Sequence, residues 1–353
     1  MYELNEKIRN MTPYAPIQGD YPIRLDANES SHNLPEWLIK KIEQRIVSIP
    51  FHRYPDPYAK EVVEAFSAFY GISPQHVTAG NGSDELIGII ASAFLQKGDT
   101  VLTILPDFSM YAFYSELDEA KVTVLEKGED LLLSPEKILQ GAKECGAKAI
   151  FLSNPCNPTG QGLTKEQVHF LINGTDALVV LDEAYMDFWD QSLIQEAAEF
   201  DHVICLKTCS KAIGLAALRL GFAVANSTIT NALRAVKSPY NVNSVTQAAG
   251  AAVLLEKDYL LQCTKELIAQ RQALYQTLLE FNTRHGNIMR IYPSHTNFVF
   301  IKTDGASFVH QSLLKKGIAV RCMGDYLRIS APTSEELPAL MAALNEIFEE
   351  GKR

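Results

Sequence analysis

A lysine that follows two hydroxyl side chains is the residue in this sequence best suited to covalent chemistry. Lys211 comes directly after Ser210 and shortly after Thr208, and Arg219 follows in the next stretch of chain. The amine of a lysine in such surroundings is a suitable nucleophile for an aldehyde. A solvated lysine in a polar loop is the alternative, and it would be the better interpretation of a lysine that stood alone.

Three further segments carry polar groups where a strand is expected to end. Residues 80–85 (GNGSDE) open a helix with small residues, and the N-terminus of such a helix can bind an anion. Residues 153–160 (SNPCNPTG) contain two X-Pro steps and a glycine, which favour a tight, defined loop. Residues 179–185 (VVLDEAY) form an apolar strand that ends in the carboxylate of Asp182. Taken singly, the three are also explained by a capped helix, a plain turn and a solvated carboxylate.

Alternating strand and helix signals surround these groups from about residue 57 onward. We expect helices at 57–70, 83–95, 108–116, 135–144 and from 165, and strands at 76–79, 100–105, 121–125, 149–152, 178–182, 203–207 and 221–225. This alternation predicts an α/β fold with a large, doubly wound, mostly parallel sheet and helices on both faces. In such a sheet, ligands bind beyond the carboxyl ends of the strands, which is where the polar segments fall.

A change of pattern after about residue 240 predicts a second, smaller α+β domain. We expect one long helix at 258–282, strands at 297–301, 319–321 and 326–330, and helices at 306–316 and from 334. The first 30 residues contain several prolines and are expected to form an irregular arm. The chain is therefore divided into an N-terminal arm (1–30), a large domain (31–240) and a small C-terminal domain (241–353).

Composition excludes several classes of protein. The formal net charge is −10 and no basic stripe is present, so we expect no binding of nucleic acid. No apolar run approaches the ~20 residues that span a bilayer, and the N-terminus has no apolar signal core, so a cytoplasmic protein without membrane contact is expected. The six cysteines form no C-x-x-C pair and the histidines have no ligand spacing, so we expect reduced thiols and no metal site.

Together and in this order, the polar segments resemble the fold-type I family of aminotransferases that depend on pyridoxal 5′-phosphate (PLP). The resemblance rests on Gly82-Ser83-Asp84, on Asn157-Pro158-Thr159-Gly160, on Asp182-x-x-Tyr185, and on Ser210-Lys211 with Arg219. It spans nearly the whole chain, and the lysine motif is its most specific part. It implies that Lys211 is the catalytic residue, which holds PLP as a Schiff base and moves a proton between substrate and cofactor.

The same resemblance implies a set of residues that hold PLP. Asp182 would pair with the pyridine nitrogen, Asn157 and Tyr185 would hydrogen-bond the phenolic oxygen, and Phe108 would stack on the ring, where many relatives carry tyrosine. The phosphate would be held by the backbone of Ser83 and Asp84, the hydroxyls of Thr208 and Ser210, and the guanidinium of Arg219. Tyr54 would reach the cofactor phosphate of a neighbouring subunit, which implies a homodimer.

Within this superfamily the chain most resembles the histidinol-phosphate aminotransferases, through residues 11–14 (MTPY), 25–29 (LDANE) and 53–56 (RYPD). Residues 30–32 (SSH) depart from that family's usual sequence. The resemblance implies transfer of an amino group between L-glutamate and 2-oxoglutarate on one side and histidinol phosphate and imidazole-acetol phosphate on the other, a step of histidine biosynthesis. It places Tyr14, Asn28, Arg321 and Arg328 in the substrate pocket, where two guanidiniums suit a phosphate. A surface role for Arg321 and a packing role for Tyr14 are the plainer alternatives.

Other functions remain open from the sequence. An aromatic-amino-acid aminotransferase would share Arg328, and a threonine-phosphate decarboxylase would also bind a phosphorylated substrate. A non-catalytic PLP-binding regulator is disfavoured by the acidic charge and the lack of an added DNA-binding module. A nicotinamide-dependent dehydrogenase is disfavoured because Glu85 stands where its loop needs a third glycine.

Overall fold

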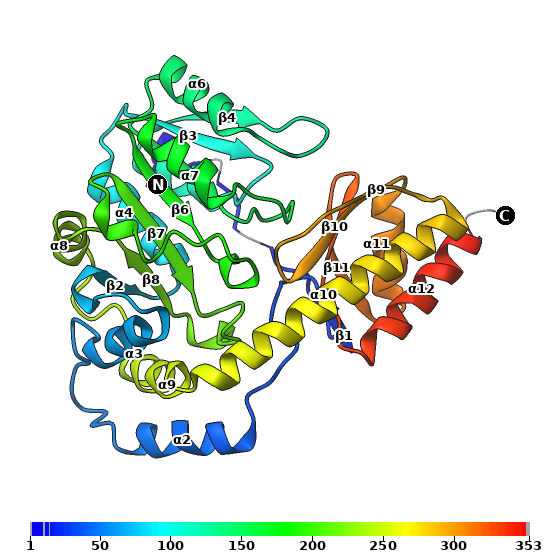
Figure 1. Ribbon diagram of the computed structural model, residues 1–353, viewed down its shortest axis with the longest axis horizontal. Helices are drawn as coiled ribbons and strands as arrows, with labels where there is room; N and C mark the ends of the chain where they lie inside the picture. Colours follow the sequence, from blue (N-terminus) through cyan, green and yellow to red (C-terminus); the bar gives the residue numbers. More distant parts are fainter. Residues whose placement is uncertain (1, 10, 14, 351–353) are drawn as a thin grey trace.

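The computed structural model describes residues 2–9, 11–13 and 15–350 (Figure 1). Its helices are α1 (Glu6–Arg9), α2 (Glu36–Val47), α3 (Lys60–Tyr70), α4 (Ser83–Phe94), α5 (Met110–Leu117), α6 (Pro135–Cys145), α7 (Lys165–Asn173), α8 (Ser227–Val236), α9 (Ser244–Leu254), α10 (Lys257–His285), α11 (Ala306–Lys315) and α12 (Glu336–Glu350). Its strands are β1 (Ile23–Leu25), β2 (Val77–Gly80), β3 (Thr100–Leu105), β4 (Lys121–Glu126), β5 (Ala149–Ser153), β6 (Leu178–Asp182), β7 (Val203–Thr208), β8 (Gly221–Val224), β9 (Ile288–Tyr292), β10 (Phe298–Thr303), β11 (Ile318–Met323) and β12 (Tyr326–Ser330).

The larger sheet has seven strands in the order β2-β8-β7-β6-β5-β3-β4. The contacts β3–β4, β3–β5, β5–β6 and β6–β7 are parallel, and only the pairings of β8 with β7 and β2 are antiparallel. The prediction of a large, mostly parallel α/β sheet is therefore confirmed. Because β5, β6 and β7 are parallel neighbours, the segments that follow them leave the sheet at the same edge.

Helices cover both faces of this sheet, and each face has its own core. One core joins the sheet to α3, α6, α7 and α9, and the other joins it to α4, α5 and α8. Strand β6 serves both cores, because Val179 and Leu181 point to the first and Val180 points to the second. A strand buried on both faces has no polar side, which explains why it is a continuous apolar run in the sequence.

The smaller sheet has five strands in the order β1-β11-β12-β10-β9. Its core is shared with α11, α12 and the second half of α10, a helix that runs from the large sheet to the small one (Figure 1). Strand β1 pairs in parallel with β11, so the segment expected to be an irregular arm contributes a strand to this sheet. The chain between β1 and α2 consequently passes from the small sheet to the large one.

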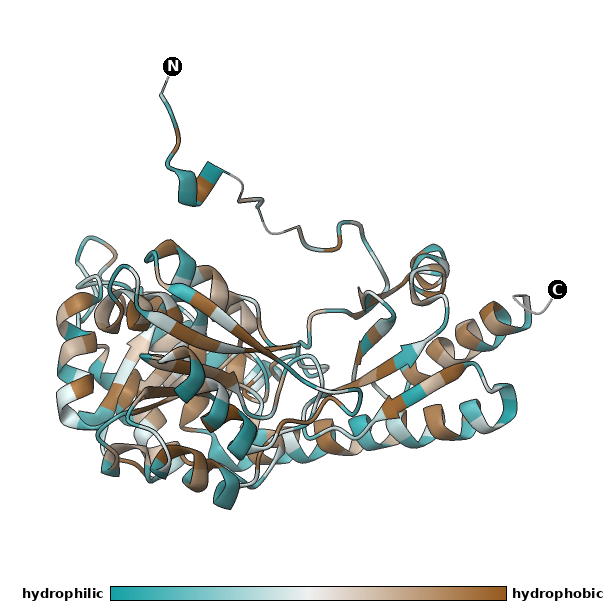
Figure 2. Cartoon of the chain, turned by 90° about the horizontal axis from the view of Figure 1, so that it is seen from above, coloured by the Kyte–Doolittle hydropathy of each residue, from teal (hydrophilic) through white to brown (hydrophobic). Residues whose placement is uncertain are grey.

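Helix α1, near the N-terminus, lies outside both sheets (Figure 2). Lys7 of α1 donates a hydrogen bond to the main-chain oxygen of Leu117, at the end of α5, at 2.8 Å. Among the residues that the structure describes, no helix is long and apolar enough to cross a membrane. Within the same part of the chain, no group of three or more histidine, cysteine, aspartate and glutamate side chains is arranged to hold a metal ion.

Candidate active site

Most of the residues singled out from the sequence lie just beyond the carboxyl ends of β5, β6 and β7. Asp182 is the last residue of β6, and its position pairs with Leu206 of β7, the strand that leads into Thr208, Ser210 and Lys211. The loop that contains Asn157 follows β5. The topology thus brings a carboxylate, an amine and two hydroxyls to one edge of the sheet.

Asp182 is a buried carboxylate, and each of its two oxygens accepts one hydrogen bond from the protein. Its side chain is 3 % exposed, its Oδ2 accepts a hydrogen bond from the hydroxyl of Tyr111 at 2.8 Å, and its Oδ1 accepts from the main-chain nitrogen of Ala184 at 3.0 Å. Burial raises the pKa of Asp182 to about 7, and the two hydrogen bonds oppose this rise. An acid with such a pKa can carry either charge state near neutrality, so a cationic partner at the strand end would ionise it.

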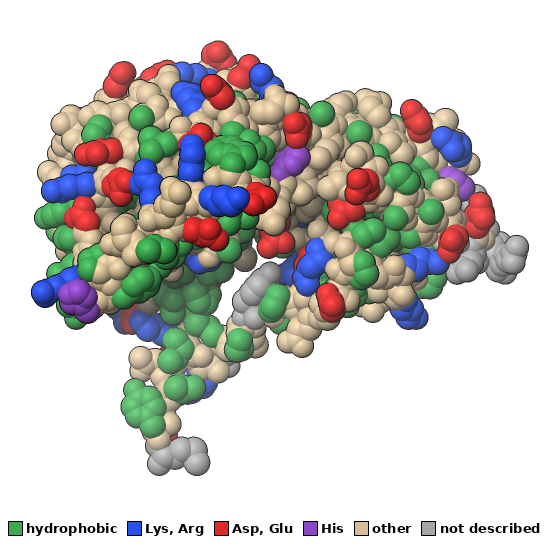
Figure 3. Space-filling model, turned by 90° about the horizontal axis from the view of Figure 1, so that it is seen from below, with side chains coloured by type: hydrophobic (Ala, Val, Ile, Leu, Met, Phe, Trp, Pro, Cys, Tyr) green, Lys and Arg blue, Asp and Glu red, His purple; other side chains and the backbone are tan. Residues whose placement is uncertain are grey.

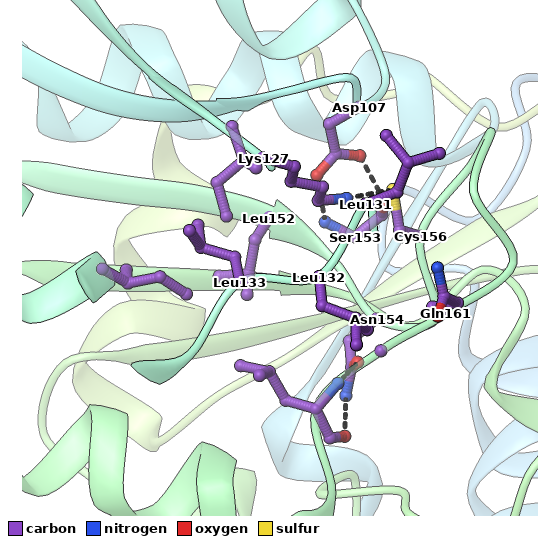
Figure 4. Close-up of a pocket in the computed structure, with 14 residues that line it drawn as sticks. Asp107, Lys127, Leu131, Leu132, Leu133, Leu152, Ser153, Asn154, Cys156 and Gln161 are labelled. Atoms are coloured by element: carbon purple, nitrogen blue, oxygen red, sulfur yellow. Dashed lines mark hydrogen bonds between the residues drawn. The ribbon is translucent and has the colours of Figure 1, made fainter. Parts of the chain in front are cut away.

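A second acid, the half-buried Asp107, lines a small cavity together with Ser153 and Lys127 (Figure 4). The main-chain nitrogen of Ser153 donates to Asp107 at 3.1 Å, and the hydroxyl of Ser153 donates to the same carboxylate. Lys127 and Cys156 line the same small cavity of about 40 Å³, and Lys127 Nζ lies 2.9 Å from Cys156 Sγ. Burial raises the pKa of Asp107, while Lys127 lowers it. This cluster fixes the start of the loop that carries Asn157.

Hydroxyl and guanidinium groups gather where β7 and β8 meet the start of α4. Ser210 Oγ accepts from the hydroxyl of Thr208 at 3.1 Å and from Arg219 Nη1 at 3.3 Å. Arg219 Nη2 also pairs with the carboxylate of Asp84 at 3.2 Å, beside Ser83, the first residue of α4. Donors at a helix N-terminus together with an arginine are the groups that hold a phosphate in proteins.

Two glycines allow this close approach. Gly82 has φ of 87°, and a Cβ there would lie 2.9 Å from Arg219 Nη2. A Cβ at Gly221 of β8 would lie 2.4 Å from the main-chain nitrogen of Ser83. A larger residue at Gly221 would push the main chain of Ser83 away, whereas one at Gly82 would be strained by the positive φ and would displace the Arg219 guanidinium.

Lys211 lies against the segment between β1 and α2. Its Nζ donates to the main-chain oxygen of Ala27 at 2.9 Å and lies 5.7 Å from the centre of the Tyr185 ring. Asn28, which is 1 % exposed, donates through Nδ2 to the hydroxyl of Tyr185 at 2.9 Å. The main-chain nitrogen of Asn28 in turn donates to the hydroxyl of Ser330, in the small sheet, at 3.0 Å. The segment therefore connects the amine to both domains.

The small domain contributes two arginines to the same region. Arg328 Nη2 donates to the main-chain oxygen of Asp26 at 2.7 Å, and its Nη1 donates to Asn157 Oδ1. Arg321 of β11 is the direct cross-strand partner of Arg328 on β12. Directly opposed residues of an antiparallel pair project from the same face of the sheet, so the two guanidinium groups belong to one face.

Phe108 and Tyr54, also predicted from the sequence, have other surroundings in the structure. Phe108 is half-buried and packs edge-on against Tyr111, with 5.6 Å between the ring centres. Tyr54 is 80 % exposed and stacks on Tyr240 at 4.6 Å, so within this subunit it is not enclosed by the site. Tyr14 lies outside the described residues.

The structure adds residues that the sequence analysis did not single out. Tyr111 of α5 donates to Asp182 across 71 positions of the chain, and no local spacing in the sequence links the two residues. Lys207, 2 % exposed, pairs with Asp187 at 3.1 Å and with Glu183 at 3.3 Å, beneath the strand ends. Burial alone would lower the pKa of Lys207, but the two carboxylates outweigh it and raise the pKa. A lysine inside an otherwise apolar strand, followed by hydroxyls, was the signal for this group.

Comparison with known proteins defines the class. Residues 21–344 match the family model "Aminotransferase class I and II", and the chain belongs to that family. Among curated proteins, it is 39% identical to a histidinol-phosphate aminotransferase of Clostridium kluyveri over 97% of this chain and 98% of the relative, and 37% identical to one of Clostridium novyi over 93% and 92%. The fold matches that of a Sinorhizobium meliloti histidinol-phosphate aminotransferase solved with pyridoxal-5'-phosphate, with a TM-score of 0.88, 24% identity, and coverage of 99% and 98%.

Proposed function

We propose that this enzyme is a PLP-dependent aminotransferase that exchanges an amino group between L-glutamate/2-oxoglutarate and histidinol phosphate/imidazole-acetol phosphate. The observation that carries the proposal is the meeting of three groups at one sheet edge. They are the amine of Lys211, the buried carboxylate of Asp182 and the anion cluster around Arg219. The relatives named above bear the name of this activity and match the chain over nearly its whole length.

The residues present fit PLP group by group. Arg219, Ser210, Thr208 and the start of α4 suit its phosphate. Asp182, with its pKa of about 7, suits a ring nitrogen that must stay protonated. The hydroxyl of Tyr185 and the amide of Asn157 suit the phenolic oxygen, and the face of Phe108 suits the ring. When bound, PLP supplies an electron-accepting ring that stabilises a negative charge at the substrate's α-carbon.

The chain's own residues then divide the remaining work. Lys211 provides the amine that anchors the cofactor and carries the proton to and from the α-carbon. Its contact with the main-chain oxygen of Ala27 orients Nζ from the side of the small domain. Asn28 holds the hydroxyl of Tyr185, so one of the groups that would face the phenolic oxygen is tied to the same segment as the amine. The position of the Lys211 amine therefore depends on the position of the small domain, because the segment of Ala27 and Asn28 contacts both.

The substrate assignment rests on Arg321 and Arg328. They lie opposite each other on adjacent strands, and two guanidiniums match a doubly charged phosphate better than a single carboxylate. Arg328 also binds the oxygen of Asn157, which brings this pair next to the cofactor site. An amino acid with an aromatic side chain would engage one arginine through its carboxylate and leave the second without a substrate partner.

Half-reaction spectroscopy tests the proposal. The PLP form of the purified enzyme absorbs visible light, and we expect the band to convert with L-glutamate and with histidinol phosphate. No conversion with either compound would contradict aminotransferase activity. Conversion with glutamate and phenylalanine, but not with histidinol phosphate, would favour an aromatic-amino-acid aminotransferase. Release of carbon dioxide from threonine phosphate would favour the decarboxylase instead.

We further infer a cytoplasmic homodimer. The exposed position of Tyr54 suits a residue that completes the phosphate site of a second subunit. Hydrophobic side chains also gather beside the N-terminal arm on the face shown in Figure 3. All six cysteines, which lie within the described residues, are free thiols, as is usual for a reducing compartment. Analytical ultracentrifugation at several concentrations tests the dimer, and a monomer at micromolar concentration would contradict it.

A further inference from the structure

Tyr111 is a buried tyrosine whose hydroxyl donates a hydrogen bond to the carboxylate of Asp182. It is 1 % exposed, lies on α5, and donates to Asp182 Oδ2 at 2.8 Å. Its ring is held between those of Phe108 and Phe151, with ring centres 5.6 Å and 5.8 Å away. A ring packed on two sides has little freedom to move, so the hydroxyl stays oriented toward the carboxylate of Asp182.

The two hydrogen bonds to Asp182 fix the plane of its carboxylate. Tyr111 holds one oxygen and the main-chain nitrogen of Ala184 holds the other, and they come from different elements. Each carboxylate oxygen has a second lone pair, so the group can still accept from a ring nitrogen. Loss of the tyrosine hydroxyl would leave Oδ2 without this partner in a buried position, where an unsatisfied polar group is costly.

The charges around Asp182 oppose its ionisation. Burial raises its pKa most, and the carboxylates of Asp107 and Asp84 raise it further. The Tyr111 hydroxyl is the strongest of the groups that lower it, ahead of the main-chain nitrogen of Ala184. Burial and the neighbouring carboxylates of Asp182 and Asp107 also raise the pKa of Tyr111 well above its ordinary value, and Cys156 adds to this. The hydroxyl therefore keeps its proton and stays a donor at every working pH.

We propose that Tyr111 is a positioning residue that keeps Asp182 oriented and ionised for its pairing with the ring nitrogen of PLP. The inference rests on the proposed function, because the ring nitrogen is the partner that makes the ionised state useful. Without the hydroxyl, the carboxylate becomes more basic and takes a larger share of the proton between it and the ring. The ring then accepts electrons less well, although Tyr111 does not touch the substrate.

The test compares Tyr111→Phe with Tyr70→Phe in the full-length enzyme. Tyr70 is a matched control, because its hydroxyl also donates to a partly buried carboxylate, that of Asp187, at 3.0 Å. It makes no hydrogen bond to Asp182. Each variant is loaded with PLP labelled with a nitrogen isotope in the ring, and the NMR shift of that nitrogen reports its protonation. The dissociation constant for PLP is measured alongside.

We expect the ring nitrogen of Tyr111→Phe to move toward its neutral shift and the dissociation constant to rise about tenfold, the scale for a hydrogen bond to a charged group. Tyr70→Phe should leave both unchanged even where it lowers the melting temperature. Equal shifts in Tyr111→Phe and the wild type would overturn the inference. A wild type that binds no PLP would instead overturn the proposed function. If Tyr111→Phe does not fold, 3-fluorotyrosine is placed at position 111, because it keeps the aromatic ring and makes the hydroxyl a stronger donor. Protonation of the PLP ring nitrogen should then increase. An unchanged ring-nitrogen shift in this variant would also overturn the inference.

Discussion

The amine of Lys211, beyond β7 in the large domain, donates to the main-chain oxygen of Ala27 at 2.9 Å. Ala27 follows β1, which is the edge strand of the small sheet, so one hydrogen bond joins the candidate catalytic group to the other domain. The next residue, Asn28, bonds to Tyr185 on the large side and to Ser330 on the small side. The site is therefore completed by a segment that both domains hold.

Replacing Lys211 tests the covalent role of its amine. We expect Lys211→Ala to abolish turnover and to leave no cofactor attached after borohydride reduction, because no other amine is proposed to reach the cofactor's aldehyde. Mass spectrometry of the reduced protein measures the attachment. Lys265→Ala, on the exposed side of α10, is the control and should retain the label. A reduced adduct in Lys211→Ala would place the covalent chemistry on a different residue.

Arg219 should dominate the affinity for the cofactor's phosphate. It holds Ser210 and Asp84 in place and carries the charge of the anion cluster, so Arg219→Ala should weaken PLP binding about ten- to hundredfold. Equilibrium dialysis of the cofactor-free protein measures this. Arg284→Ala is the matched surface control, since Arg284 is 71% exposed and pairs with Glu280 in the preceding turn of its helix. Equal affinities in the two variants would remove Arg219 from the phosphate site.

Replacing Arg321 should affect the reaction with histidinol phosphate more than the reaction with glutamate. Arg321→Gln removes one of two opposed guanidiniums, so it should weaken histidinol phosphate about tenfold or more and change the glutamate half-reaction much less, because glutamate carries no phosphate. Single-turnover kinetics with each substrate gives the two values. Arg290→Gln, on the far edge strand of the same sheet, controls for a general loss of charge. An equal loss with both substrates would contradict a phosphate-binding role.

The strands that frame the site were predictable because burial on both faces makes them apolar runs between turn signals. The predicted bounds of β3, β6 and β12 agree with the structure. Helix α3 begins at Lys60 rather than at residue 57, because Ala59 has a left-handed conformation with φ of 49°; Asp56 Oδ2 then accepts from the main-chain nitrogen of Lys60 at 2.9 Å. Start signals are weakest where a turn precedes the helix, so such shifts of a few residues are expected.

Other elements gave no usable pattern. Helix α9 is buried almost throughout and lacks a polar face, so its alanines and glycine carry no helical period. The edge strand β9 shows no strict alternation of buried and exposed residues. Helices α2 and α8 and the small strand β1 were also not predicted. Short elements of this kind are determined by tertiary contacts, which a single sequence does not display.

The site was predictable only as a set of residues, without its internal contacts. The residue types around Lys211 and Asp182 indicated the chemistry, but Asn28 and Tyr185 are 157 positions apart, and nothing local links them. Tyr111 was missed for the same reason, because its partner Asp182 lies on another element. Side chains that act through a second residue leave no spacing of their own in the sequence.

The pKa of Asp182 should make the stability of the cofactor-free protein depend on pH. The pKa is about 7 in the folded protein against 3.8 ordinarily, so the folded state binds the extra proton. The resulting stabilisation is fully present below about pH 4 and is lost as the pH rises through about 7, a change on the order of 4 kcal/mol. Urea unfolding of the wild type and of Asp182→Asn measures it. The stability difference between the two should vary over this range and be flat above it; parallel curves would contradict the pKa.

Mixed dimers test whether Tyr54 serves the site of a second subunit. Tyr54→Ala and Lys211→Ala should each be nearly inactive alone, because each homodimer lacks one required group in both sites. If Tyr54 acts across the interface, a mixed dimer has one site with neither group and one site with both. Random mixing should then restore about a quarter of the wild-type activity. If Tyr54 acts within its own subunit, every site in the mixture lacks one group and no activity returns. The high exposure of Tyr54, which stacks on Tyr240 at the surface of its own chain, favours the first outcome.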